Sequence, residues 1–193
     1  MNVDLRSDTV TRPTREMLRA MAEAETGDDV FGEDPTANAF QERMADLFGF
    51  GAGLFVPSGV MGNQICLKML TSPGEEAVTD RTGHMFNYEN TSAALLSSVQ
   101  LHPVEGERGK IGGEQIRAAM RSGRDWEPVS SAVIIENATN KGGGACYTRS
   151  ELIEVRETAR ELGLAVHLDG ARVWNAVTAT EVPPSFSGRW PTP

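Results

Sequence analysis

The sequence lacks several features that mark whole classes of protein. Its two cysteines, Cys66 and Cys146, stand far apart and outside any metal-binding spacing, so we expect neither a disulfide nor a zinc site. No apolar run approaches the roughly 20 residues of a membrane-spanning helix. The N-terminus also lacks the charged and then apolar segments of a signal peptide. We therefore expect a cytoplasmic protein.

Positive charge is scarce as well. The chain has 18 Lys and Arg residues against 27 Asp and Glu residues, which gives a net charge of −9 at pH 7. Proteins that bind nucleic acid or anionic membranes present basic surface, so this balance argues against both kinds of partner. Lysine is especially rare: the sequence has Lys68, Lys110 and Lys141, and none after Arg172.

What the chain does contain is an alternation of helix and strand patterns. We expect strands at 54–57, 77–80, 99–104, 132–136 and 164–169. Helical patterns cover 14–24, 35–48, 59–70, 113–121 and 149–162, the last with a capping box at Thr148 and Glu151. This alternation predicts an α/β fold, a mostly parallel sheet with helices on both faces.

The most informative segment is VHLDGARVWNA, from Val166 to Ala176. It reads as an apolar strand that carries Asp169 at its carboxyl end, where parallel sheets bind ligands. A buried carboxylate there can hold a protonated heterocyclic nitrogen. The nearby Arg172 can hold a phenolate oxygen or a substrate carboxylate.

A second candidate site is FVPSGVMGNQ, in which a tight turn at Ser58 and Gly59 opens a helix. Free backbone N–H groups and the positive end of the helix dipole favour a phosphate at such a turn. An ordinary strand-to-helix turn explains this motif equally well when it is taken alone.

Two more segments carry polar groups at strand ends. His84, in RTGHMFNYEN, could stack on an aromatic ligand or move a proton, although a lone histidine is more often structural. Residues 136–140 (ENATN) precede Lys141 and three glycines; they could face a ligand or form only a turn.

Together these segments supply the parts that pyridoxal 5'-phosphate needs. The chain resembles the threonine aldolase and β-eliminating lyase family, whose fold is that of aspartate aminotransferase. The resemblance rests on DLRSDTVTRPT, GDDVFGEDPTAN, PSGVMGNQ and HLDGAR, which follow one another in the family's order. It spans residues from about 3 to about 178, and its first and last motifs are specific to the family.

The resemblance implies a role for each matching residue. Ser58, Gly59 and Val60 would hold the cofactor phosphate, and His84 would stack on the pyridine ring. Asp169 would keep the ring nitrogen protonated, which makes the ring an electron sink. The remaining assignments are Arg172 for the phenolic oxygen or substrate carboxylate, Ser7 for that carboxylate, and Glu89 and Asn137 for supporting hydrogen bonds.

The implied reaction is that of a low-specificity L-threonine aldolase, which cleaves L-threonine or related β-hydroxy-α-amino acids to glycine and an aldehyde. His84 is the candidate base for the β-hydroxyl proton. The resemblance also implies a homo-oligomer, dimeric or tetrameric. Two alternatives stay open: another pyridoxal-phosphate-dependent enzyme, such as a β-eliminating lyase or a decarboxylase, and a non-catalytic fragment.

The chain departs from the family pattern in three places. Val60 stands where many relatives have threonine, and Thr139 where some have histidine. Relatives also bind the cofactor covalently through a lysine beyond the HLDGAR segment, in a sequence resembling SKGLG. None of the three lysines matches that position, so we expect the chain alone to be inactive.

The last residues suggest a reason for the missing lysine. We expect 1–180 to form part of the cofactor-binding large domain, 181–193 to be irregular, and the small C-terminal domain to be absent. Restoring one G in GC-rich codons for Ser185–Pro193 yields a plausible continuation of the domain, which suggests a frameshift. A naturally short protein with a disordered proline-rich end is the alternative.

Overall fold

A four-stranded parallel sheet organises the molecule. The computed structural model describes residues 3–188. The strands run in the order β2-β1-β3-β4, and every described pair of neighbours is parallel. Their bounds are β1 Glu76–Asp80, β2 Gln100–Val104, β3 Ser130–Glu136 and β4 Ala165–Asp169. The predicted parallel sheet is confirmed.

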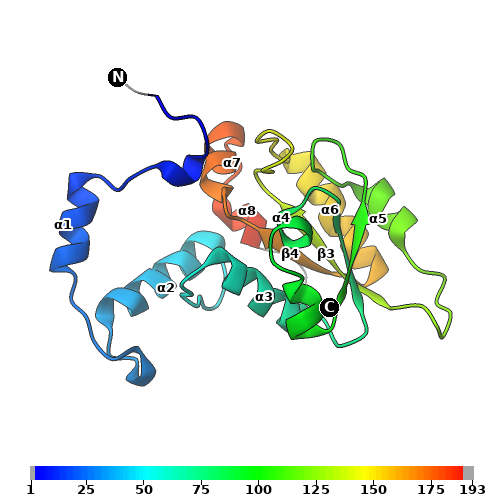
Figure 1. Cartoon of the computed structure of the whole chain (residues 1–193), viewed down its shortest axis with the longest axis horizontal. Helices are drawn as coiled ribbons and strands as arrows, with labels where there is room; N and C mark the ends of the chain where they lie inside the picture. The colour runs from blue at the N-terminus through cyan, green and yellow to red at the C-terminus, as the bar shows by residue number, and fades with distance from the viewer. Residues whose placement is uncertain (1–2, 189–193) are drawn as a thin grey trace.

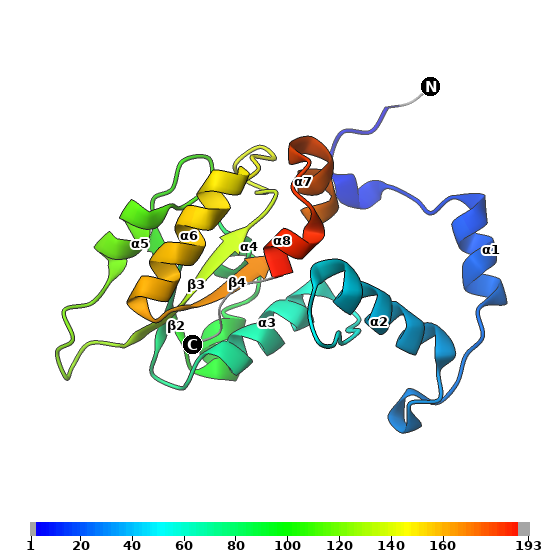
Figure 2. The ribbon, with the colours of Figure 1, turned by 180° about the vertical axis from the view of Figure 1, so that it is seen from behind.

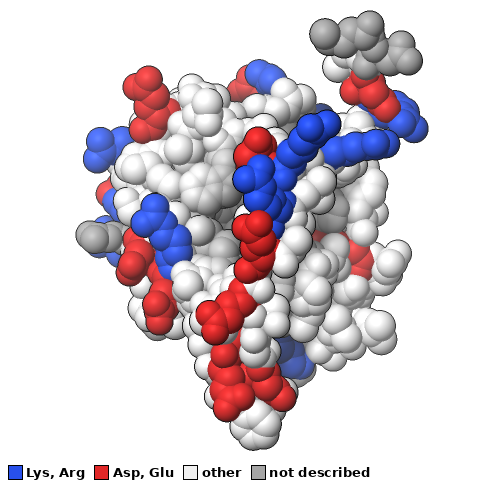
Figure 3. Space-filling model, turned by 90° about the vertical axis from the view of Figure 1, so that its left-hand side faces the viewer, with Lys and Arg blue, Asp and Glu red and all other residues white. Residues whose placement is uncertain are grey.

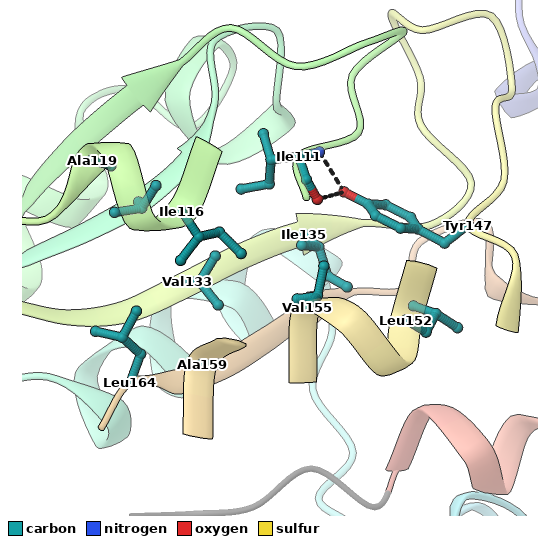
Figure 4. Close-up of a cluster of buried hydrophobic side chains, with 11 residues drawn as sticks. Ile111, Ile116, Ala119, Val133, Ile135, Tyr147, Leu152, Val155, Ala159 and Leu164 are labelled. Carbon is teal, nitrogen blue, oxygen red and sulfur yellow. Dashed lines mark hydrogen bonds between the residues drawn. The ribbon is translucent and has the colours of Figure 1, made fainter. Parts of the chain in front are cut away.

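One face of the sheet is covered by α5 (Gly113–Ala119) and α6 (Arg149–Leu162) (Figure 2). Figure 4 shows the core between them, where Val133 and Ile135 of β3 meet Ile116 of α5 and Val155 of α6. Tyr147 closes one end of this core. Its hydroxyl accepts a hydrogen bond from the backbone N–H of Ile111 at 2.8 Å.

The opposite face packs against α3 (Gly59–Leu70) and the short π-helical turn η3 (Ala93–Ser97). Ala132 and Ile134 of β3 point to this side, where they join Leu67 of α3 and Ala93 of η3 in a second apolar cluster. Alternate residues of one strand thus enter opposite cores, as the two-residue period of a strand requires. The predicted helices on both faces are confirmed.

Helix ends follow the capping residues of the sequence closely. Asp34 caps α2 (Pro35–Phe48), whose first residue is proline. Thr148 and Glu151 form the predicted capping box of α6, and Gly163 ends that helix with a left-handed φ of 69°. The remaining elements are η1 Asp8–Val10, α1 Arg15–Glu23, η2 Asp29–Phe31, α4 His84–Asn87, α7 Val173–Thr180 and α8 Pro184–Gly188.

The prediction of a strand at 54–57 is wrong. This segment pairs with no described strand, and Leu54 and Phe55 remain exposed. Phe55 is held instead by α2: its backbone N–H donates to Gln41 Oε1 at 2.9 Å, and its ring lies edge-on to Phe40. The apolar residues fit the pattern of a strand, but no described strand lies beside this segment to form backbone hydrogen bonds with it.

Within the segment 181–193, which the sequence predicts to be irregular, residues 184–188 form the short helix α8. Pro184 stands at the first helical position, where a missing N–H removes no helical hydrogen bond. Phe186 packs against the α6 side of the core, below the guanidinium groups of Arg149 and Arg156. Residues 189–193 lie outside the described part of the chain.

The N-terminal segment, residues 3–34, passes beside α7 at η1, loops outward through α1 and returns through η2 to α2 (Figure 1). No residue of α1 is buried, and Met17, Leu18 and Met21 are all more than half exposed. Figure 3 views this side and shows broad uncharged surface beside a band of charged side chains. Across residues 3–188, no helix has the length and apolar character that crossing a membrane would need.

The core between the sheet and α6 yields a stability prediction. Leu152 is 1% exposed, so Leu152→Ala should lower the free energy of unfolding by about 2–5 kcal/mol through lost burial and the cavity left behind. Urea unfolding followed by circular dichroism measures this change. Leu95→Ala, at a side chain that is 78% exposed, is the matched control; equal losses in the two variants would contradict the assigned core.

Candidate active site

The turn before α3 has the donors that a phosphate needs. Ser58 is the N-cap of α3, and its Oγ accepts a hydrogen bond from the backbone N–H of Met61 at 3.1 Å. The hydroxyl proton of Ser58 is still free to be donated. The backbone N–H groups of Gly59 and Val60 belong to the first turn, so the helix offers them no carbonyl. A Cβ placed on Gly59 would meet no atom within 4 Å, so the turn is open to a ligand.

Asp169 ends β4 with its carboxylate buried, 5% of the residue being exposed. Its Oδ2 accepts a hydrogen bond from Asn63 Nδ2 at 3.0 Å. Its Oδ1 accepts one from the backbone N–H of Ala171 at 3.1 Å. The carboxylate is therefore held from two sides, by α3 and by its own strand end.

His84 opens α4, directly after β1 and its turn. Its Nδ1 lies 2.9 Å from Glu89 Oε1, and its side chain is 33% exposed, so the ring is both anchored and accessible. Its ring centroid lies 5.5 Å from that of Tyr88. The structure brings His84, Glu89 and Asp169 together, with one polar atom of each within 4.8 Å of the others.

Arg172 makes none of the described hydrogen bonds to Asp169. It precedes α7 and binds Asp8 of the N-terminal segment, with Nε to Oδ2 at 2.6 Å and Nη2 to Oδ1 at 2.9 Å. Ser7 is adjacent to this pair, but it is exposed and its Oγ accepts a hydrogen bond from the backbone N–H of Thr9. The two residues predicted to bind the substrate carboxylate are thus linked through Asp8, which follows Ser7 in the sequence and pairs with Arg172.

The end of β3 completes the site from the other side. Glu136 is buried and accepts hydrogen bonds from the backbone N–H groups of His84 and Asn140. Burial raises the pKa of the Glu136 carboxyl, and these two bonds oppose that shift. Asn137 is buried too; its Oδ1 accepts from the backbone N–H of Tyr147. Both residues therefore shape the loop beside the site.

Three buried polar residues near the site escaped the sequence analysis: Asn63, Gln64 and His167. Gln64 Nε2 donates to Glu89 Oε2 at 2.7 Å, and His167 Nε2 lies 2.9 Å from Asn63 Oδ1. Burial lowers the pKa of His167, while Asp169 and Glu89 oppose that shift. Two features of the sequence could have indicated these residues: Asn63 and Gln64 are adjacent amides in a largely apolar helix, and His167 lies inside an apolar strand.

Residues 4–186 match the family model described as beta-eliminating lyase, which covers nearly all of the chain. The chain belongs to this family. The match includes every residue of the site described above.

Relatives in the family are similar to this chain over more than nine tenths of its length. It is 41% identical over 186 residues to low-specificity L-threonine aldolase 1 of Arabidopsis thaliana, a match of 94% of this chain and 52% of the relative. It is 39% identical over 178 residues to the low specificity L-threonine aldolase of Escherichia coli K12, with 92% and 53% covered. The chain thus spans about half the length of these curated relatives.

A solved structure gives the same result for the fold. The Leishmania major threonine aldolase superposes with a TM-score of 0.75 at 24% identity, over 90% of this chain and 51% of that one. At this identity the likeness shows the fold alone. The predicted α/β fold of the family is confirmed.

The pair of Asp8 and Arg172 generates a prediction. Asp8→Asn should release the N-terminal segment, because these side chains join residues 164 apart in the sequence. Hydrogen exchange should become faster in residues 8–10 with little change in global stability, since the pair is partly exposed.

The hydrogen bonds from Arg172 lower the pKa of Asp8. The contact should therefore persist at neutral pH and be lost only as pH falls through this lowered pKa, below the ordinary aspartate value of about 3.9.

Asp4→Asn is the matched control, because Asp4 pairs only with neighbouring Arg6 among the ion pairs of the described chain. Equal exchange rates in residues 8–10 for the wild type and Asp8→Asn would show that this contact does not hold the segment.

Proposed function

We propose that this chain is the cofactor-binding part of a pyridoxal-phosphate-dependent lyase. The reaction proposed is cleavage of L-threonine and related β-hydroxy-α-amino acids to glycine and an aldehyde. The family is pyridoxal-phosphate-dependent and includes threonine aldolases. The observation that carries the proposal is the buried Asp169 carboxylate at the end of β4, beside the accessible ring of His84.

The residues present fit this cofactor. The open turn at Ser58, Gly59 and Val60 supplies donors for a phosphate, and Asp169 supplies a buried carboxylate for a protonated ring nitrogen. When bound, the cofactor would supply an electron sink for the pair released from the Cα–Cβ bond. Asp169 would then act where negative charge enters the ring.

His84 and Arg172 would act on the substrate. The ring of His84 is anchored by Glu89 and partly exposed, which suits it to stack on the cofactor or to take a proton from the β-hydroxyl. A guanidinium has five N–H donors, and Asp8 accepts from two of those on Arg172. The other donors leave Arg172 able to bind a substrate carboxylate, with Ser7 close by.

We propose further that the chain alone does not turn over. Among the described hydrogen bonds and ion pairs, none of its lysines contacts the Asp169 carboxylate: Lys68 Nζ donates to the carbonyl of Leu96, and Lys110 pairs with Glu151. Lys141 lies over the ring of Tyr88, with Nζ 5.4 Å from the centroid. A lysine from the remaining half of the family's length would supply the covalent attachment.

The chain alone should therefore bind pyridoxal 5'-phosphate weakly or not at all and release no acetaldehyde from L-threonine. Absorbance after dialysis measures binding, and coupling to alcohol dehydrogenase measures acetaldehyde. A band that survives dialysis and shifts on addition of glycine would contradict this. The proposed reaction needs a longer protein for its test. This protein is the one encoded when the downstream DNA is read in the frame that continues the family sequence.

In that longer protein, L-threonine should yield glycine and acetaldehyde, and Asp169→Asn should lower kcat on the order of 10²-fold. Exposed Asp46 on α2 provides the control, Asp46→Asn. Pyruvate and ammonia from L-serine, without cleavage of L-threonine, would favour the β-eliminating alternative instead. If no family-like frame follows in the DNA, the frameshift hypothesis fails and the chain is a non-catalytic fragment.

We also propose that the protein is a cytoplasmic homo-oligomer whose subunits meet through the N-terminal segment. Apolar side chains are exposed along it, among them Met17, Leu18, Met21, Val30 and Phe31. An exposed apolar surface of this kind is characteristic of an interface.

Size-exclusion chromatography with light scattering should show a dimer or tetramer. The double variant Leu18→Glu and Met21→Glu should shift the population towards monomer, because charge would be placed in the interface. Arg19→Glu is the control, since helical spacing places Arg19 on the other side of α1. A monomer at all concentrations would overturn this proposal.

A further inference from the structure

Asn63 lies at the centre of the polar side chains around Asp169. It stands on α3 four residues after Gly59, so both face the same side of the helix. Its residue is 8% exposed although its neighbours in α3 are largely apolar. Asparagine is a poor helix former, so a buried one in mid-helix calls for a specific contact.

That contact is with two carboxylates at once. Asn63 Nδ2 lies 3.0 Å from Asp169 Oδ2 and 2.8 Å from Glu89 Oε1. An amide nitrogen carries two hydrogens, so each carboxylate receives one. Glu89 Oε1 also contacts His84 Nδ1, which extends the chain of hydrogen bonds from Asp169 to the ring of His84.

The orientation of the Asn63 amide follows from the same chemistry. Ionised carboxylates only accept hydrogen bonds, so the NH₂ group must face Asp169 and Glu89 and the oxygen must face His167. His167 Nε2 lies 2.9 Å from that oxygen. This nitrogen must therefore carry the proton, which makes neutral His167 the Nε2–H tautomer.

His167 is placed for this contact by the strand. It precedes Asp169 by two residues in β4, so both side chains leave the same face of the sheet, the face that α3 covers. It is 7% exposed, and burial lowers its pKa, which keeps the ring neutral near pH 7. The carboxylates of Asp169 and Glu89 are the charges that oppose that shift.

We propose that Asn63 is a positioning residue that holds the carboxylates of Asp169 and Glu89 in a fixed mutual arrangement, and that His167 sets the orientation of its amide. Asp169 is thereby fixed through Oδ2 by Asn63 and through Oδ1 by Ala171, with lone pairs left for a ligand nitrogen. The inference rests on the proposed function only for what Asp169 is positioned to bind.

Nuclear magnetic resonance of the ¹⁵N-labelled full chain tests this arrangement without any cofactor. Long-range ¹H–¹⁵N spectra distinguish the tautomers of His84, His102 and His167. The wild type should show His167 as the neutral Nε2–H tautomer at pH 7, and both side-chain amide protons of Asn63 should be protected from exchange. An Nδ1–H tautomer of His167, or an Asn63 amide that exchanges freely, would overturn the proposal.

Two matched variants separate the contact from general electrostatics. Asn63→Asp replaces the amide by a carboxylate next to His167, so the proton affinity of His167 should rise about tenfold or more. Gln64→Glu also adds a carboxyl beside Glu89, but Gln64 contacts neither His167 nor Asp169 among the described hydrogen bonds. It should raise the proton affinity of His167 much less than Asn63→Asp does.

Equal rises in the two variants would contradict a positioning role for Asn63. If Asn63→Asp does not give the dispersed spectrum of a folded chain, the test of Asn63 as a positioning residue rests on two wild-type measurements. These are the tautomer of His167 and the protection of the Asn63 amide protons from exchange. Failure of the proposed function appears separately, as absence of cofactor binding or aldol cleavage in the longer protein.

Discussion

Asp169 and Glu89 bring two carboxylates out of water, with polar atoms within 4.8 Å of each other, and the surrounding structure must replace the water they lose. An unpaired buried carboxylate would take up a proton, and a neutral Asp169 could not hold a protonated ligand nitrogen. The donors of Asn63, Gln64, His84 and Ala171 meet this requirement. These donors come from α3, from α4 and from the turn after β4.

The parallel sheet explains how these donors come together. Because β1, β3 and β4 run in the same direction, their carboxyl ends deliver Asp80, Glu136 and Asp169 to one edge. The loop after β1 then leads to His84 and Glu89, while α3 crosses the adjacent face and contributes Asn63. The second apolar cluster, with Leu67 of α3 against Ala132 and Ala165, fixes the helix that carries that amide. Packing of the apolar core therefore determines the geometry of the polar site.

Local signals explain which parts of the structure could be predicted from the sequence. Ser58, Asp34 and Thr148 cap helices through contacts only three residues long, so these helix starts could be read directly. The position of Asp169 at a strand end was equally local. By contrast, the contacts of Asn63 with His167 and Asp169 span 104 and 106 residues, and no short pattern encodes them. The strand predicted at 54–57 failed for the same reason: pairing depends on a neighbour that the pattern does not contain.

The contact between Asp8 and Arg172 extends this argument to the N-terminal segment. It joins residues 164 apart, yet it places the family's opening motif beside the strand end that carries Asp169. The segment beyond it includes α1, in which no residue is buried, and it exposes its apolar side chains. A segment attached at the site but uncovered along its length is stabilised only if another surface covers it. The chain spans about half the length of these relatives, and we propose that the remaining half of the family's length or a second subunit supplies that surface. In both cases the completed site would depend on groups outside this chain, while the carboxylates and their donors are already in place within it.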